Sequence, residues 1–218
     1  MLNNIKSYLL LALIALFFSA CVSEPAPRHD YSAFLQSNPR SILVPMPIND
    51  SADIKASSVV LAHAVPPLTE AGYYVFPVGL VNDTFKFNGF SEAHEIHQIP
   101  LAKLKQIFNA DSVLYLHVKE YGSSYVILDS VSRVSVEARL VDINSGQVIW
   151  QNSATASNSS QGGGDLVSML INAAVKQVAD TLSDVSYDLA IKADRKLFTM
   201  GCDGCLLYGP YSPKYRQF

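Results

Sequence analysis

The 218-residue sequence has few charges, few cysteines and no long apolar run. Charged residues make up 16% of the chain and the net charge is -3, so there is no broad basic field to hold nucleic acid. The apolar stretch from Tyr8 to Ala20 has about a dozen residues, whereas a membrane-spanning helix needs about 20. We therefore expect neither nucleic-acid binding nor a spanning helix.

The N-terminus instead has the layout of a signal peptide, with one lysine, an apolar middle and small residues before Cys21. The residues Phe18-Ser19-Ala20-Cys21 resemble a bacterial lipobox, although Phe18 stands where leucine is usual. The resemblance implies that residues 1–20 are removed and that Cys21 carries fatty acids such as palmitate. Val22, in place of aspartate, predicts passage to the outer membrane. A plain signal peptide and an uncleaved signal anchor are the alternatives.

If lipid occupies Cys21, two of the three cysteines remain, Cys202 and Cys205, in an oxidising compartment. We predict a structural disulfide between them. Metal ligation, unpaired thiols and thiol–disulfide catalysis are alternatives. A thioredoxin-like motif would begin a helix after a strand, whereas this pair lies near the C-terminus among glycines and prolines.

The pattern of the mature chain predicts a single α/β domain at residues 39–190, preceded by a lipidated N-terminus and tether at 21–38 and followed by a C-terminal tail at 191–218. The predicted elements follow the order β-α-β-α-β-β-β-α, a mixed sheet of about five strands packed with three or four helices. The expected strands are short apolar or alternating runs at 42–44, 73–78, 112–118, 126–143 and 147–157.

Helical spacing of apolar residues predicts the buried faces of the helices. For the first two helices these residues are Ile54, Leu61, Val65 and Leu68, and then Leu101, Leu104, Ile107 and Phe108. Pro66 and Pro67 are expected to break or restart the first helix. Residues 79–100 are interpreted as a polar surface connection, and residues 121–125 as a hairpin turn. A second turn at 142–147 has Asn144 and Gly146 available for positive φ.

Several polar residues invite a functional interpretation, and each has a simpler one. His94 and His97 have a spacing that two metal ligands can use, but a site needs three or four ligands, so exposed histidines of a polar loop are preferred. Asp165 follows three glycines and is expected to cap a long helix. Asp50 and Asp53 are interpreted as charges at a helix start rather than as paired acids with Glu70. We therefore predict no catalytic residues, no metal and no cofactor.

Aromatic residues point to packing and contact surfaces. Trp150 is expected in the core. Five tyrosines are candidates for a contact surface: Tyr73, Tyr74, Tyr115, Tyr121 and Tyr125. The tail from Leu206 to Phe218 is rich in tyrosine and proline, and two interpretations stay open, docking on a partner or on its own domain.

Four segments carry a more specific resemblance: YSAFLQSNPRSILVPMPINDSADIKA, AGYYVFPVGLVNDTFKFNG, ADSVLYLHVKEYGSSY and ARLVDINSGQVIW. They are similar to a family of bacterial lipoproteins of unknown function, over nearly the whole mature chain, and the tail CDGCLLYGPYSP resembles one branch of it. The resemblance implies a fold similar to the N-terminal domain of TolB, the Tol-system propeller protein, and to the periplasmic domain of CsgG-like secretion channels. It also implies a CsgG-like lipoprotein as an envelope partner.

Two functions follow from these observations. The first is a non-catalytic adaptor or assembly factor in a cell-envelope complex of the secretion or transport type. It would be anchored by lipid in the outer membrane and face the periplasm. Display on the cell surface and assembly into a homo-oligomer are left open. This hypothesis predicts an exposed apolar or aromatic patch and no buried acids with shifted pKa. The alternative is a periplasmic enzyme, above all a thiol–disulfide catalyst using Cys202 and Cys205.

Overall fold

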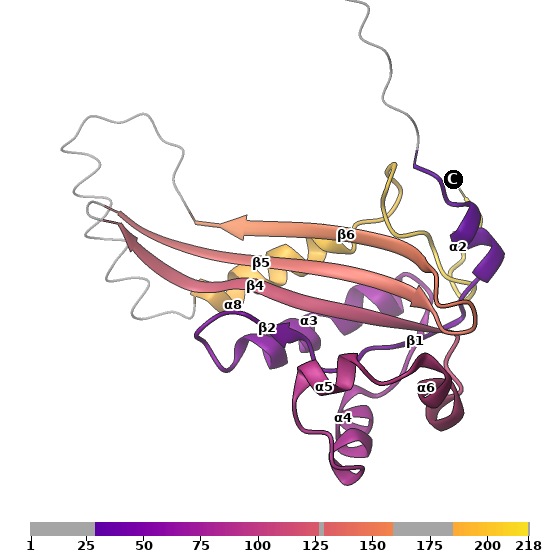
Figure 1. Cartoon of the computed structure of the whole chain (residues 1–218). Coiled ribbons are helices and arrows are strands. Elements are labelled where there is room, and N and C mark those ends of the chain that lie inside the picture. Colours follow the sequence, from indigo (N-terminus) through magenta and orange to yellow (C-terminus); the bar gives the residue numbers. More distant parts are fainter. Residues whose placement is uncertain (1–28, 127–128, 159–184, 218) are drawn as a thin grey trace, which may run out of the picture.

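A computed structural model describes residues 29–126, 129–158 and 185–217 of the chain. These residues form one mixed β-sheet with helices on both faces (Figure 1). The strands are β1 (Ser41–Leu43), β2 (Ile48–Asn49), β3 (Tyr74–Val75), β4 (Ser112–Val126), β5 (Asp129–Asp142) and β6 (Val148–Ser157). The described helices are α2 (Ser32–Ser37), α3 (Ala56–Glu70), α4 (Val78–Phe87), α5 (Ala93–His97), α6 (Leu101–Phe108) and α8 (Val185–Leu197). The predicted α/β class with a mixed sheet is confirmed.

The sheet has the strand order β3-β1-β4-β5-β6, and β2 pairs with the same edge of β4 as β1 does. Pairings among β1, β2, β3 and β4 are parallel, whereas β4, β5 and β6 form a long antiparallel meander. The short strands β1 and β2 pair only with the first half of β4, between Ser112 and Val118, and the meander extends beyond them (Figure 1).

Alternation along the strands divides the buried side chains between two cores, because successive residues point to opposite faces. Ile42 and Leu114 belong to the larger core, which α3 and α8 cover. Their neighbours Leu43 and Val113 belong to the smaller core, which residues of α4, α5 and α6 complete. The alternating run expected at 126–143 contains β5, and its apolar positions Val134, Val136, Ala138 and Leu140 are all buried. Trp150 is 2% exposed, so its predicted core position is also confirmed.

The hairpin turn predicted at residues 121–125 is wrong, because β4 continues through them to Val126. Pairing with β5 extends to Val126 opposite Asp129. Small polar side chains in this stretch resemble a turn in the sequence. In the structure Ser123 pairs across the strands, where its Oγ lies 2.7 Å from Ser132 Oγ.

The surface connection predicted at residues 79–100 is also wrong, because it contains α4 and α5. Val81 and Phe85 lie one turn apart on α4, and both are 2% exposed. Ile96 of α5 packs into the same small core. Asparagines, glycines and charges between these apolar residues conceal the helical spacing in the sequence.

The first predicted helix differs from α3 in two respects. Ile54 is 91% exposed and precedes the helix, so its assignment to the buried face is wrong. Leu61 and Leu68 are buried as predicted, and Val65 is half-buried. Pro66 and Pro67 do not break α3, which runs to Glu70. The carbonyl of Ala62 loses its partner at Pro66, but Ala62 is exposed and water can satisfy this group.

Two smaller predictions also fail. Ile107 of α6 is 40% exposed, although Leu104 is buried as expected. In the turn before β6, Gly146 has the predicted positive φ of 72°, but Asn144 does not have one. The carboxylate of Asp142 holds this turn by hydrogen bonds and makes a second left-handed residue unnecessary.

Both termini of the described chain pack on the domain. Phe34 of α2 is 4% exposed, although residues 21–38 are expected to form a tether. Helix α8 continues past residue 190, where the tail was expected to begin. Cys21, residues 159–165 with their glycines, Asp165 and the helix expected after it lie outside the described residues. In the described ranges, no helix combines the length and apolar character that crossing a membrane requires.

Candidate functional site

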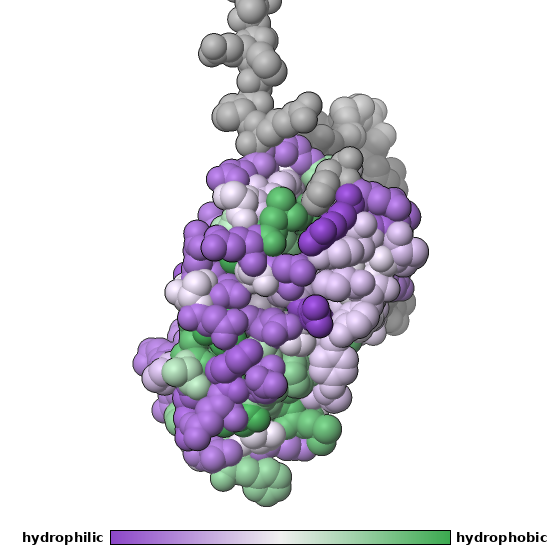
Figure 2. Space-filling model, turned by 90° about the vertical axis from the view of Figure 1, so that its right-hand side faces the viewer, coloured by the Kyte–Doolittle hydropathy of each residue, from purple (hydrophilic) through white to green (hydrophobic). Residues whose placement is uncertain are grey.

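Exposed apolar side chains gather on the small helical layer. We call the set Leu80, Phe87, Phe90 and Ile107 the helical apolar surface. Phe87 is 90% exposed and Leu80 is 66% exposed, although both lie on α4, whose other face is buried. Figure 2 shows green surface at its lower end, where Figure 1 places α4. Large exposed apolar groups that cluster are typical of contact surfaces.

A groove of about 560 Å³ lies within this surface, between α4, α5 and α6. Phe85 and Ile99 are buried against its floor, and Phe90 and Ile107 stand at its edge. Glu95 and Lys103 supply charges of both signs at the rim. The groove can therefore accept an apolar side chain of another molecule, with polar contacts around it.

A second groove, of about 540 Å³ and polar, crosses the face of the meander next to α5. Tyr115, His117, Glu137 and Arg139 line it. At its margin Asp50 Oδ2 lies 2.8 Å from His117 Nε2 and 2.5 Å from Lys119 Nζ. Hydrogen bonds from Lys119 and then His117 lower the pKa of Asp50 to about 2. The interpretation of Asp50 as a charge at a helix start is therefore wrong, because it pairs with β4.

The two histidines of the HEIH segment point in different directions. His94 is exposed as predicted, but His97 is half-buried and lies on α5 rather than in a loop. His97 Nε2 lies 2.9 Å from the Met46 carbonyl oxygen, and its ring contacts Tyr115. Burial lowers the pKa of His97 to about 4, against the opposing effect of the Met46 hydrogen bond. In the ranges that the structure describes, no cluster of His, Cys, Asp and Glu could hold a metal ion.

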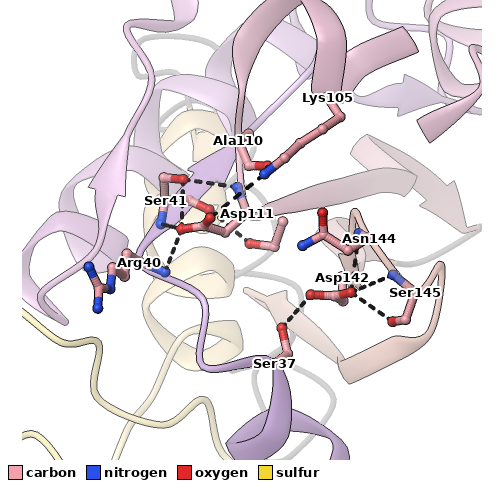
Figure 3. Close-up of polar contacts among 10 residues, drawn as sticks. Ser37, Arg40, Ser41, Lys105, Ala110, Asp111, Asp142, Asn144 and Ser145 are labelled. Carbon is pink, nitrogen blue, oxygen red and sulfur yellow. Dashed lines mark hydrogen bonds and ion pairs between the residues drawn. The ribbon is translucent and has the colours of Figure 1, made fainter. Parts of the chain in front are cut away.

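Two carboxylates, Asp111 and Asp142, are the centres of polar networks at the end of the sheet (Figure 3). Asp111 Oδ2 accepts hydrogen bonds from the backbone N–H groups of Arg40 and Ser41, at 3.0 and 3.1 Å, and from Ser41 Oγ at 3.1 Å. Lys105 Nζ lies 4.0 Å from the other oxygen of Asp111. Asp111 thus fixes the entry of β1 beside the start of β4.

Asp142 joins α2 to the turn between β5 and β6. Ser37 Oγ donates to its Oδ2 at 2.6 Å, and the N–H and hydroxyl of Ser145 donate to its Oδ1, both at 2.7 Å. Burial opposes ionisation of Asp142, but the hydrogen bonds from Ser37, Ser145 and Asn144 outweigh it and lower its pKa. The lowered pKa of Asp142 keeps it ionised, which is unfavourable for a general acid.

Asp194 contradicts the expectation that no buried acid has a shifted pKa. Asp194 is 0% exposed on the inner face of α8, and neither carboxylate oxygen has a hydrogen-bond partner among the described residues. Burial raises its pKa to about 8. No charged neighbour contributes to this shift, so Asp194 is an isolated acid and not one of a pair. The sequence signal that could have identified Asp194 is its position in α8, where the other buried residues are apolar: Leu189, Ala190, Ala193 and Leu197.

The C-terminal segment packs on its own domain, which decides between the two interpretations of the tail. The N–H of Gly209 donates to the Ala71 carbonyl at 2.8 Å, and the N–H of Tyr211 donates to the Gly72 carbonyl at 3.0 Å. The approach is so close that a Cβ on Gly209 would lie 2.3 Å from the Gly72 carbonyl oxygen. The Tyr73 hydroxyl donates to the Leu207 carbonyl at 2.6 Å, which explains why this tyrosine is buried.

Cys202 and Cys205 lie in a tight loop of this segment, with their Cα atoms 5.2 Å apart. That separation is within the range of disulfides. Cys202 is exposed and Cys205 is 7% exposed, and neither begins a helix. The carbonyl groups of the loop are acceptors for the core, because Trp150 Nε1 donates to Gly204 at 3.1 Å and the Tyr31 hydroxyl donates to Cys205 at 2.7 Å.

The other predicted site residues are not brought together. Asp53 Oδ1 accepts a hydrogen bond from the Lys55 N–H before α3, and Glu70 is exposed at the end of that helix. Among the candidate tyrosines, Tyr73 and Tyr121 are buried, Tyr115 is half-buried and Tyr74 is 50% exposed. They do not form one contact surface. The side chain of Tyr125 lies outside the described residues.

Comparison with known proteins shows the relationship directly. The family described as "Putative lipoprotein GNA1162-like" matches residues 29–211. A Neisseria meningitidis protein named "Putative lipoprotein NMB1124/NMB1162" is 46% identical over 206 residues, covering 93% of this chain and 95% of that protein. The crystal structure of lipoprotein GNA1162 from Neisseria meningitidis is 48% identical with a TM-score of 0.53, covering 65% of this chain and 99% of that one. The chain belongs to the GNA1162-like lipoprotein family.

Proposed function

We propose that the protein is a lipid-anchored component of the cell envelope that acts as a non-catalytic adaptor or assembly factor. Its anchor is the acylated Cys21, its location is the periplasmic side of the outer membrane, and its partner is another envelope protein, such as a CsgG-like lipoprotein. Membership of a lipoprotein family supports the anchor. Three acyl chains on one cysteine would bind far more firmly than the single chain that holds only marginally.

The helical apolar surface is the observation that carries the adaptor role. Burying an exposed phenylalanine or leucine contributes about 1.5–3 kcal/mol, and Phe87 and Leu80 are left largely in water. Phe90 and Ile107 of the same surface line an apolar groove that Glu95 and Lys103 also line, an arrangement that resembles the core and rim of a protein interface. A complex in which a partner covers this surface would be stabilised by the burial of these side chains. In the monomer they stay exposed to water and contribute nothing of this kind.

The polar groups of the described residues favour binding over catalysis. Asp111 and Asp142 accept several structural hydrogen bonds, and burial is the cause of the raised pKa of Asp194. Cys202 and Cys205 lack the helix N-terminus that activates the thiol of disulfide catalysts. We propose that they form a structural disulfide, which keeps the loop acceptors for Tyr31 and Trp150 in place.

Site-specific photo-cross-linking in intact cells tests the adaptor role. A photoreactive phenylalanine analogue at position 87 is expected to give a discrete protein adduct that mass spectrometry identifies as an envelope protein. The matched control has the analogue at Glu70, which is exposed at the end of α3. The adduct is expected to weaken in the Cys21→Ser variant. Equal adducts from positions 87 and 70, or none from either, would contradict the proposal.

A further inference from the structure

The pole of the domain where the anchoring segment joins it carries an apolar groove of about 800 Å³. Tyr31, Leu35, Leu206, Leu207 and Tyr208 provide its aromatic and aliphatic lining. We call it the tether-root groove. It combines the first described residues of the chain with the C-terminal segment, which lie side by side near α2 in Figure 1.

Hydrogen bonds fasten the root of the tether to this groove. The N–H of His29 donates to Asp203 Oδ1 at 2.9 Å, and the Tyr31 hydroxyl donates to the Cys205 carbonyl at 2.7 Å. The chain therefore leaves the domain at a defined point, beside the loop that contains Cys202 and Cys205.

The distance from this point to the membrane is bounded by chain length. Eight residue steps separate Cys21 from His29, and a fully extended chain advances at most about 3.6 Å per residue, so the root lies within about 29 Å of the acylated residue. A domain held this closely must turn one region toward the bilayer. The α4 end lies at the opposite end of the molecule from the point where the chain leaves (Figure 1), so the helical apolar surface points away from the anchor.

The groove has the chemistry of a membrane interface. Leu35 is 48% exposed at its edge. Lys214 Nζ lies 5.5 Å from the ring centroid of Tyr208, which places an exposed cation beside a half-buried aromatic ring. Tyrosine rings and lysines are enriched at headgroup level, where the ring and the aliphatic stem are apolar and the polar tip stays in water. Two acids, Asp30 and Asp203, also line the groove, and their carboxylates accept hydrogen bonds from the backbone N–H groups of Ser32 and His29.

We propose that the tether-root groove is a membrane-contact surface that seats on the headgroup region of the bilayer holding the Cys21 lipid. This inference rests on the proposed lipid anchor. The groove would contact phospholipid, and the helical apolar surface would face the periplasm. The domain would therefore have a fixed orientation relative to the membrane.

Photo-cross-linking on vesicles tests the orientation. The lipidated full mature chain is reconstituted with a photoreactive phenylalanine analogue at Leu35, and Phe87 serves as the matched control because it is also an exposed apolar residue. Phospholipid adducts are expected from position 35 and not from position 87. The mass of the N-terminal lipopeptide, measured on the same sample, reports the anchor separately. An acylated Cys21 without a lipid adduct at position 35, or with equal adducts at both positions, would overturn the inference. A protein adduct or a self-adduct at position 35 would also overturn it.

A charge variant supplies a second measurement that does not need the anchor. The mature Cys21→Ser chain is titrated with phosphatidylglycerol vesicles at low salt. Lys214→Gln is expected to weaken binding roughly 5-fold, since each basic residue at an anionic membrane surface contributes ~1 kcal/mol. Lys86→Gln on α4, also exposed, is the control and is expected to leave affinity unchanged. Equal effects of the two variants would contradict the proposed contact.

Discussion

Replacing the buried acid Asp194 by asparagine is expected to stabilise the domain, and by an amount that depends on pH. Asp194 is 0% exposed and its carboxyl has no hydrogen-bond partner in the part of the chain that the structure describes. It lies in the last turn of α8, where the helix dipole disfavours a negative charge. Burial raises its pKa from 3.8 to about 8. Below pH 3.8 the group is neutral in both the folded and unfolded states, so Asp194 imposes no ionisation penalty there.

The penalty grows as pH rises from the unfolded pKa toward the folded pKa, because only the unfolded chain releases the proton in that range. Each pH unit removes about 1.4 kcal/mol of stability, which gives about 1.6 kcal/mol at pH 5 and about 4 kcal/mol at pH 7. Asp194→Asn keeps the shape of the side chain but cannot ionise. The variant is therefore expected to be more stable than the wild type at pH 7, with a gain about 2–3 kcal/mol larger than at pH 5.

Urea unfolding of the mature Cys21→Ser chain at several pH values measures this difference. Asp188→Asn is the matched control, because Asp188 is an exposed acid in the first turn of the same helix. Replacing this exposed side chain is expected to change the free energy of unfolding by no more than about 0.5 kcal/mol, as is usual for surface substitutions. The reasoning would be refuted if the free energy of unfolding of the wild type and of Asp194→Asn changed in parallel with pH. Asp194 would then be ionised in the folded state at the same pH as in the unfolded chain.

Three further predictions concern the C-terminal segment and can be measured by the same urea unfolding. Gly209→Ala is expected to cost at least about 2 kcal/mol, because its Cβ would lie 2.3 Å from the Gly72 carbonyl oxygen, whereas Gly79→Ala on α4 meets no atom within 4 Å and is expected to stabilise by about 0.5–1 kcal/mol. Equal effects would mean that the segment does not pack as described. The double variant Cys202→Ser, Cys205→Ser is expected to lose about 2 kcal/mol, the loop-closure contribution of a short disulfide, and an unchanged free energy of unfolding would argue for unpaired thiols. Trp150→Phe removes the hydrogen bond to the Gly204 carbonyl at 3.1 Å and part of a fully buried ring, so a loss of about 1–3 kcal/mol is expected. A loss below about 0.5 kcal/mol would indicate that this carbonyl finds water instead.

The sequence by itself determined the α/β class and the meander, because strict alternation in β5 and the turn at Gly146 are local signals. It also predicted the burial of Trp150 and of one face of α3. Helical spacing identified α6. It did not identify α4, where exposed Leu80 and Phe87 add to the polar residues that conceal the spacing, or α5, which is only five residues long. That departure from the simple pattern is itself the candidate interaction surface.

Only the tertiary structure decided where the polar residues and the chain ends lie. Asp50 pairs with β4 and not with a helix start because β2 aligns it with His117 and Lys119, a contact between residues far apart in sequence. The tail docks on its own domain because Gly72 and Gly209 allow two backbones to approach, and neither glycine indicates its partner in the sequence. The isolation of Asp194 also depends on what surrounds it. Periodicity depends on residues that are close in sequence. The burial of Asp194, the pairing of Asp50 and the placement of the tether-root groove and the helical apolar surface arise only when distant segments pack together.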